Sequence, residues 1–191
     1  MNFNNHFSNR KCSKCHISPC SCKNICRVPR VFMGPIRAIG QAGSTSTIGA
    51  TCGLCEYGYI YNLTPQTVPI EADVLFDSNG LMTPGIVHTL GTSQIMINVP
   101  GDYEVTFSVS GTEPNQFALF LNGSLVPGTV YGSGAGTQQN NGQAIIAIVA
   151  NDVLTLRNHS SAAAVGLASV IGGTQANVNA SIVIKMLNPS A

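Results

Sequence analysis

Apolar and polar residues alternate with a period of two along much of the chain beyond residue 55. The alternation is clearest at 103–109, where apolar side chains at the odd positions are separated by Glu104, Thr106 and Ser108. A half-buried strand buries every second side chain, so this pattern predicts a strand with one buried and one solvent-facing side. The preceding Pro100-Gly101-Asp102 supplies a turn.

Similar apolar segments recur at intervals of about 8–12 residues, with turn signals between them. Asn122-Gly123 is the strongest hairpin signal, and Asn151-Asp152 marks another turn. The run 143–150 is almost continuously apolar, which predicts a strand buried on both faces. Residues 160–173 fit either a short helix or a strand of small residues. The other predicted strands are 57–61, 68–76, 94–99, 117–121, 125–126, 153–157 and 178–187.

About eight to ten strands without a convincing helix predict an all-β fold. A two-sheet jelly-roll sandwich is the expected architecture, because it protects the strand edges of a β-rich chain of this length. The composition agrees, since of 191 residues 44% are hydrophobic and only 9% charged, with 20 Gly, 10 Pro and no Trp. It excludes a long helical or coiled-coil protein, and the length allows one domain plus a tail.

Charge and cysteine content both change near residue 55. Residues 1–55 hold seven of the nine basic residues and no acid, whereas residues 56–191 hold all eight acids against Arg157 and Lys185. The formal charges are therefore +7 and −6. We expect an extended, basic, cysteine-rich N-terminal arm at 1–55 and the jelly-roll head domain at 56–191. The cysteines all precede the head: Cys12, Cys15, Cys20, Cys22, Cys26, Cys52 and Cys55.

No residue pattern in the head points to catalysis. The glycine-rich stretch 132–137 precedes a β-type run rather than the helix that a phosphate-binding loop requires. His88 and His159 are isolated in the sequence, and we expect them in loops or at the surface. The acids lie mostly beside turns, where a carboxylate bonds nearby backbone groups. We predict a protein that is not an enzyme and that uses no cofactor or metal ion.

The nearly balanced charge, formally +1, predicts neither a nucleic-acid partner nor a membrane-binding surface. The most apolar stretch, 144–150, is far shorter than the ~20 residues of a membrane-spanning helix. The N-terminal residues are polar and basic and lack the apolar run of a secretory signal, so Sec-type export is not expected.

Two segments, 98–109 (NVPGDYEVTFSV) and 120–129 (FLNGSLVPGT), resemble the C-terminal domain of the BclA-type collagen-like glycoproteins of the bacterial spore exosporium. Residues 58–62 and 180–185 are similar to that domain's first and last strands. The resemblance extends over residues 57–187. It implies the jelly roll of tumour necrosis factor and of the complement globular head, assembled as a homotrimer, which would explain the scarcity of charge in the head.

The sequence departs from this family before the head, where the family has a Gly-X-Y collagen stalk and this chain has the arm. Part of the arm weakly resembles the Gly-Pro leader that attaches such proteins to the spore surface. The resemblance implies deposition on the spore surface, in the exosporium or coat, from within the mother cell, without a signal peptide. The resembling residues are Val31, Phe32, Met33, Gly34, Pro35 and Ile36.

The cysteines allow more than one interpretation. Cys12-x-x-Cys15 and Cys52-x-x-Cys55 resemble a four-cysteine zinc site, but the pairs lie farther apart than the usual ~15–20 residues and three cysteines are left over. Seven cysteines cannot all pair within one chain, so we favour disulfides between subunits, each worth a few kcal/mol. The further alternative is a disordered, partly reduced tail.

The opposite charges of arm and head predict that the arm docks on a neighbouring subunit. Exposed ion pairs contribute only ~0–1 kcal/mol each, so the apolar residues of 31–36 must anchor it, at a sheet edge or in a groove between protomers. A head-to-tail contact between subunits that does not close into a ring produces a fibre. We predict a structural subunit of a spore-surface fibre or appendage, built from trimeric heads stacked head to tail, with another coat or exosporium protein at its base. The alternative is an anchored trimeric head that acts as an adhesin or ligand-binding module.

Overall fold

The computed structural model describes residues 54–136 and 138–190. These residues form strands and connecting loops without a helix, so nothing in this part of the chain has the helical length and hydropathy needed to span a membrane. The strands are β1 (Tyr57–Asn62), β2 (Gln66–Val68), β3 (Ser78–Met82), β4 (Ile86–His88), β5 (Ile95–Ile97), β6 (Gly101–Val109), β7 (Asn115–Leu121), β8 (Ser124–Leu125), β9 (Tyr131–Ser133), β10 (Asn140–Ile148), β11 (Asp152–Asn158), β12 (Val165–Leu167) and β13 (Ala180–Pro189).

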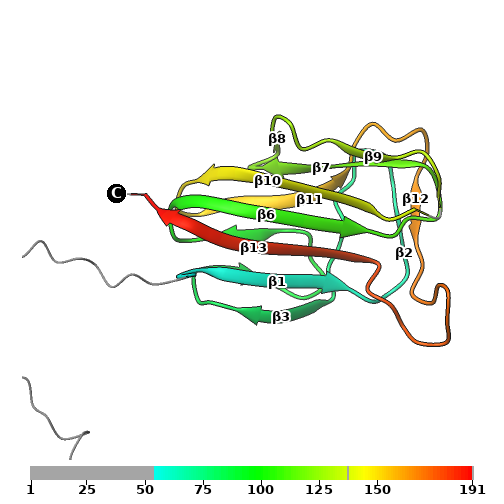
Figure 1. The fold of residues 1–191 in the computed structure, drawn as a ribbon, viewed down its shortest axis with the longest axis horizontal. Coiled ribbons are helices and arrows are strands. Elements are labelled where there is room, and N and C mark those ends of the chain that lie inside the picture. Colours follow the sequence, from blue (N-terminus) through cyan, green and yellow to red (C-terminus); the bar gives the residue numbers. More distant parts are fainter. Residues whose placement is uncertain (1–53, 137, 191) are drawn as a thin grey trace, which may run out of the picture. The chain divides into compact units, whose positions relative to one another are not determined.

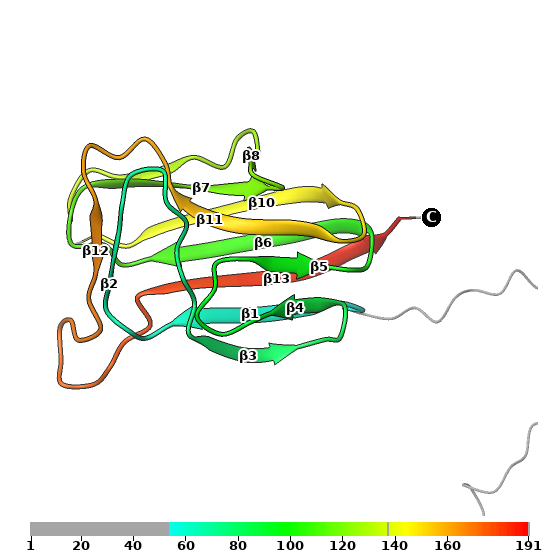
Figure 2. The ribbon, with the colours of Figure 1, turned by 180° about the vertical axis from the view of Figure 1, so that it is seen from behind.

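Two antiparallel sheets pack face to face (Figures 1 and 2). The first has the strand order β10-β6-β13-β1-β3, and the second has the order β4-β5-β11-β7-β8, with β9 also paired to β7. A small ladder of β12 and β2 lies at one end. Neighbours in both sheets are mostly distant in sequence, as in a jelly roll, where chain crossings between two sheets protect the strand edges. The predicted all-β jelly-roll sandwich is confirmed.

The clearest predicted strand is the centre of the first sheet. In β6 each odd-numbered residue from Gly101 to Val109 is buried and each even-numbered one faces outward. The hairpin predicted at Asn122-Gly123 also forms, between β7 and β8. Both turn residues have positive φ, 51° and 77°, the conformation that Asn and Gly tolerate best.

Among the described residues, the core lies between the two sheets, and its buried side chains come from positions 60 to 186. Its largest fully buried side chains include Tyr103 and Phe107 of β6, Phe117 of β7 and Phe76 of the loop before β3. Each fully buried side chain of this size stabilises the fold by about 1.5–3 kcal/mol.

The two ends of the sandwich differ. The base is the end where β1 begins and β13 ends, and the apex is the opposite end, where β6 ends and β10 and β13 begin (Figure 1). The apex carries the loops that follow β6, precede β10 and connect β12 to β13. The base carries the short turns after β3, β5 and β10.

Three sequence predictions are corrected. The run 143–150 is not buried on both faces, because in β10 exposure alternates and Ile145 is 70% exposed. Within 68–76 only the first residue belongs to a strand, β2, and Asp73 and Phe76 make isolated bridges. Gly101 and Asp102 lie in β6 rather than in a turn. Residues 160–173, which fitted either a short helix or a strand of small residues, contain the short strand β12.

Candidate assembly interface

The outward side of the first sheet is not covered by any other segment in the described part of the chain. In Figure 1 this sheet faces the viewer, and no other described segment crosses in front of β6, β13 and β1. We call the outward side chains of β1, β13, β6 and β10 the assembly face. Its cross-strand rows, in that strand order, are Tyr61, Ser181, Ser108 and Asn141; Tyr59, Val183, Thr106 and Gln143; and Tyr57, Lys185, Glu104 and Ile145.

Tyrosines form one margin of the assembly face. The rings of Tyr59 and Tyr61 stack with centroids 5.0 Å apart and an interplanar angle of 19°. Gly80 on the neighbouring β3 makes room for them, because a Cβ there would lie 2.7 Å from Tyr59 Cδ1. Partial burial raises the pKa of Tyr59, and the charge of a neighbouring Tyr61 phenolate would raise it further, so the phenol stays neutral at physiological pH.

An exposed isoleucine marks the other margin. Ile145 of β10 lies opposite Glu104, whose carboxylate accepts a hydrogen bond of 3.0 Å from Lys185 Nζ. Glu104, Gln143, Ala144 and Ile145 surround a shallow hollow of about 280 Å³. The face thus carries stacked phenols on one side, an ion pair in the middle and an uncovered aliphatic side chain on the other.

Part of the outward side of the second sheet, around Phe120, is covered by polar side chains, whereas Val87 and Met96 on the same side are 45% and 41% exposed. Phe120 of β7 is only 5% exposed, because Arg157 Cζ lies 4.1 Å from its ring centroid and the His159 ring packs edge-on at 5.4 Å. Arg157 Nε in turn donates to Asp73 Oδ1 at 2.7 Å. This cap closes the surface around Phe120 within the chain.

His88 was predicted in a loop or at the surface, and that prediction is wrong. It lies in β4 and is buried, with Nδ1 2.6 Å from Asn79 Oδ1 and Nε2 3.1 Å from the Thr92 carbonyl oxygen. Asn79 Nδ2 also donates to the His88 carbonyl at 3.0 Å. The histidine therefore joins β3 to β4 across the edges of the two sheets, which is a structural role. His159 follows β11 and is partly exposed, as predicted, and its Nδ1 lies 2.9 Å from Glu71 Oε2.

Asp152 bonds nearby backbone, as predicted, because it accepts a hydrogen bond from the Val149 amide three residues before it. Asp77 instead accepts hydrogen bonds from the amides of Leu63 and Thr64, which are 14 and 13 residues away in the sequence. These contacts fix turns. Among residues 54–136 and 138–190, no group of His, Cys, Asp and Glu has an arrangement that could hold a metal ion.

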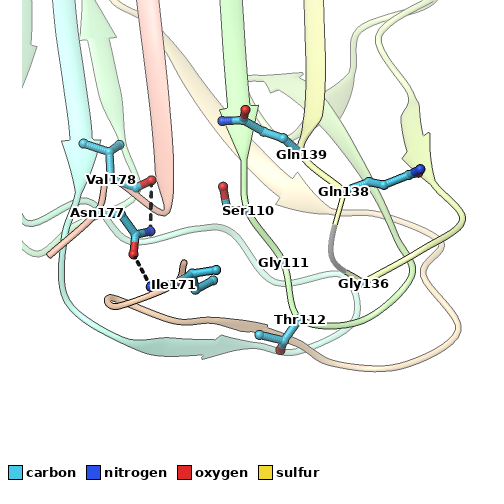
Figure 3. Close-up of a pocket in the computed structure, with 9 residues that line it drawn as sticks. All are labelled: Ser110, Gly111, Thr112, Gly136, Gln138, Gln139, Ile171, Asn177 and Val178. Atoms are coloured by element: carbon cyan, nitrogen blue, oxygen red, sulfur yellow. Dashed lines mark hydrogen bonds between the residues drawn. The ribbon is translucent and has the colours of Figure 1, made fainter. Parts of the chain in front are cut away.

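A pocket of about 540 Å³ opens at the apex, beside the end of the assembly face (Figure 3). We call it the apical pocket. The end of β6, the segment before β10 and the loop before β13 form its walls, and no charged side chain lines it. Its residues are Ser110, Gly111, Thr112, Gly136, Gln138, Gln139, Ile171, Asn177 and Val178.

Most of the predicted site residues lie outside the described residues. These are six of the cysteines and the whole docking segment 31–36. Cys55 is described, and it is half-buried and packs against the core. The assembly face itself was missed from the sequence. The alternating tyrosines 57, 59 and 61 were noted only as a strand, and the apolar run 143–150 was interpreted as doubly buried, which hid the exposure of Ile145.

The fold and the uncovered sheet define a jelly-roll head domain, and one solved structure, a complement globular domain, supports this fold. The globular domain of zebrafish complement 1qA is 11% identical, covers 71% of this chain and 98% of its own, and has a TM-score of 0.55. Eiger TNF from S. frugiperda is 12% identical and covers 71% of this chain and 94% of its own, with a TM-score of 0.49. Murine APRIL is 7% identical and covers 69% of this chain and 98% of its own, with a TM-score of 0.48.

The family model of the BclA C-terminal domain matches residues 58–186 of this chain. The chain belongs to this family, as the motifs predicted. The family is associated with the exosporium at the spore surface, and domains of this kind are structural or ligand-binding rather than enzymatic. No curated protein is similar enough to count as a relative.

Proposed function

We propose that the protein is the structural subunit of a spore-surface fibre, in which homotrimeric heads stack head to tail through their N-terminal arms. The observation that carries the proposal is the assembly face, an uncovered sheet with two unlike margins. Family membership supports the spore surface as the location, and the opposite charges of the arm and the head support their association.

The geometry of the assembly face favours a ring. Because the strand order is β10-β6-β13-β1, Ile145 and the stacked Tyr59 and Tyr61 lie on opposite margins, three strand spacings or about 14 Å apart. A face with unlike margins pairs heterologously, margin to opposite margin, and such contacts close into a ring when the rotation allows. Three copies would bury Ile145 of each protomer against the tyrosines of the next. This closed contact is the proposed trimer.

The fibre needs a second, open contact, and the arm supplies it in this proposal. The head begins at the base, so residues 1–55 of each protomer leave from the end that faces the next trimer. Val31, Phe32, Met33 and Ile36 anchor the arm, while Gly34 and Pro35 favour an extended chain. Cysteines of the arm then lock the joint by disulfides between subunits, without a cofactor. A coat or exosporium protein holds the lowest trimer.

Negative-stain electron microscopy of the full chain, beside a variant that begins at Glu56, tests this proposal. The truncated variant retains all the buried core residues of the described chain, from 60 to 186, so we expect it to fold and to trimerise. We expect filaments from the full chain and discrete trimers from the variant. Addition of reductant separates disulfide locking, which would weaken the filaments, from purely non-covalent docking.

If both proteins give only discrete trimers, the fibre is wrong and an anchored trimeric head, an adhesin or ligand-binding module, becomes the better account. If the variant forms filaments as well, the arm is not the connector. Zinc analysis of the full chain under reducing conditions tests the remaining interpretation of the cysteines. One bound zinc per chain would favour the four-cysteine site over cross-linking.

A further inference from the structure

We propose that the apical pocket is the site that receives residues 31–36 of an arm from the neighbouring trimer. The inference rests on the proposed fibre and adds the place and chemistry of its joint. The pocket lies at the apex, the opposite end from the base where the head begins, so in a head-to-tail stack it faces the arms of the next trimer (Figures 1 and 3).

The walls of the apical pocket suit an extended apolar peptide. Ile171 and Val178 provide apolar surface, and Ile171 is held in place by its amide, which donates to Asn177 Oδ1 at 2.9 Å (Figure 3). The Ser110 hydroxyl and the side-chain amide of Gln138 have no hydrogen-bond partner within residues 54–136 and 138–190. They are available to the backbone of a bound strand, which must satisfy its N–H and C=O groups.

The absence of charge from the lining narrows the class of ligand. A phosphate, sulfate or carboxylate ligand would call for a basic side chain in the wall, and none of the lining residues is basic. Of the two basic residues in the described head, Arg157 pairs with Asp73 and Lys185 pairs with Glu104. A neutral, largely apolar segment is the better fit, and the arm contains one at 31–36.

The charge beside the apical pocket is opposite in sign to the charges that flank residues 31–36. Glu113 adjoins the pocket residue Thr112, and hydrogen bonds from the Gly166 amide at 2.7 Å and the Thr112 hydroxyl at 2.8 Å lower the pKa of its carboxyl, so it is ionised at neutral pH. Residues 31–36 are flanked by Arg30 and Arg37. An apolar run set between two cations thus meets an apolar pocket with an anion at its rim.

The length of the arm is sufficient for this contact. Eighteen residues separate Arg37 from Glu56. Fully extended, they span at most ~60–65 Å, about twice the ~30 Å length of a nine-residue strand such as β6. The arm reaches the apex of a trimer stacked below with length to spare. It is also long enough to reach the apex of its own head, so the test must distinguish the two.

Ile171→Lys in the full chain tests the pocket. Ile171 is 49% exposed, so the substitution places a cation in the pocket without opening the core. Leu90→Lys is the matched control, because Leu90 is 59% exposed and lies outside both the apical pocket and the assembly face. We expect both variants to keep the trimer mass in light scattering, and Ile171→Lys alone to reduce the filament count at least tenfold. Equal filament counts for the two variants would overturn the pocket assignment.

Photo-crosslinking locates the segment directly. Phe32 of the full chain is replaced by the photoreactive benzoylphenylalanine, and equal amounts of ¹⁵N-labelled and unlabelled protein are assembled and irradiated. We expect mixed-label cross-links from position 32 to peptides that contain residues 110–112 or 171–178. Filaments with cross-links elsewhere, or only within one chain, overturn the inference and leave the proposed function standing. If the wild-type chain forms no filaments, both the pocket assignment and the proposed fibre are wrong.

Discussion

The two sheets of the head bury their inner sides in the same way and treat their outer sides differently. On the second sheet, Phe120 is covered by Arg157 and His159, and Arg157 is held by Asp73. On the first sheet, Tyr59, Tyr61 and Ile145 have no comparable cover from the described residues. This cover is local, because Val87 and Met96 on the same outer side are 45% and 41% exposed. In the trimer that we propose, the uncovered side chains of the first sheet are the ones that face a neighbouring protomer.

Ile145→Lys is the sharpest way to break the assembly face. The side chain is 70% exposed in the single chain, so the monomer should fold normally, whereas a lysine buried against tyrosines in a trimer would lose its hydration. We expect the mass in light scattering to fall from that of a trimer to that of a monomer, with an unchanged circular dichroism spectrum. Leu90→Lys serves again as the control and should remain trimeric. A trimeric Ile145→Lys would place the interface elsewhere.

Phe120→Ala tests the capped surface of the second sheet. A buried phenylalanine truncated to alanine typically costs about 3–5 kcal/mol, and here the caps of Arg157 and His159 lose their support as well. We expect a loss of this size in urea unfolding of the monomeric Ile145→Lys background. In the wild-type background, light scattering should still report a trimer. If Phe120→Ala instead dissociates the trimer at little cost in stability, the roles of the two surfaces are reversed.

Asp77→Asn tests a contact that belongs to neither outer face. Burial alone would raise the pKa of Asp77, but hydrogen bonds from the Thr64 and Ser78 hydroxyls and from the Leu63 and Thr64 amides outweigh it and lower the pKa from 3.8 to about 2. A group whose pKa is lowered by folding stabilises the fold above its unfolded pKa and loses that contribution as the pH falls.

The shift of about two units corresponds to about 2 kcal/mol at neutral pH. We expect urea unfolding to give a difference of this size between wild type and Asp77→Asn at pH 7. The difference should shrink below about pH 4 and disappear only below about pH 2, where the carboxyl is protonated in both states. A difference that does not depend on pH would mean that Asp77 acts through packing alone.

The parts of the fold that the sequence predicted are those governed by local rules. The alternation in β6 and the positive-φ preference of Asn122-Gly123 are properties of short segments, and both were predicted correctly. Whether β10 is buried on one side or on both depends instead on whether a second layer covers its outer face, and no segment among the described residues does so. An apolar run destined for an interface between subunits has the same pattern as one buried within a subunit.

The burial of His88 depended on contacts distant in sequence. Its ring is enclosed by Asn79, Thr92 and Phe76, which an isolated histidine in a sequence does not reveal. The apical pocket likewise combines three loops that only the topology brings together. Motif order, by contrast, was enough to predict the family.

Glu104→Gln has the smallest expected effect. It compares the assembly face exposed in the monomer with the same face covered in the proposed trimer. In the monomer, Glu104 and Lys185 are each 35% exposed, and an ion pair of this kind contributes only ~0–1 kcal/mol. In the proposed trimer the same pair lies beneath the neighbouring protomer, where removal of one partner leaves the other charge buried and unpaired.

We therefore expect Glu104→Gln to change the free energy of thermal unfolding by at most ~1 kcal/mol in the monomeric Ile145→Lys background. The same substitution in the wild-type background should lower trimer stability by more, measured as a shift of the dissociation curve with protein concentration. Equal effects in the two backgrounds would mean that the ion pair stays in water, and that the trimer contact is confined to the margins formed by Ile145 and the tyrosines.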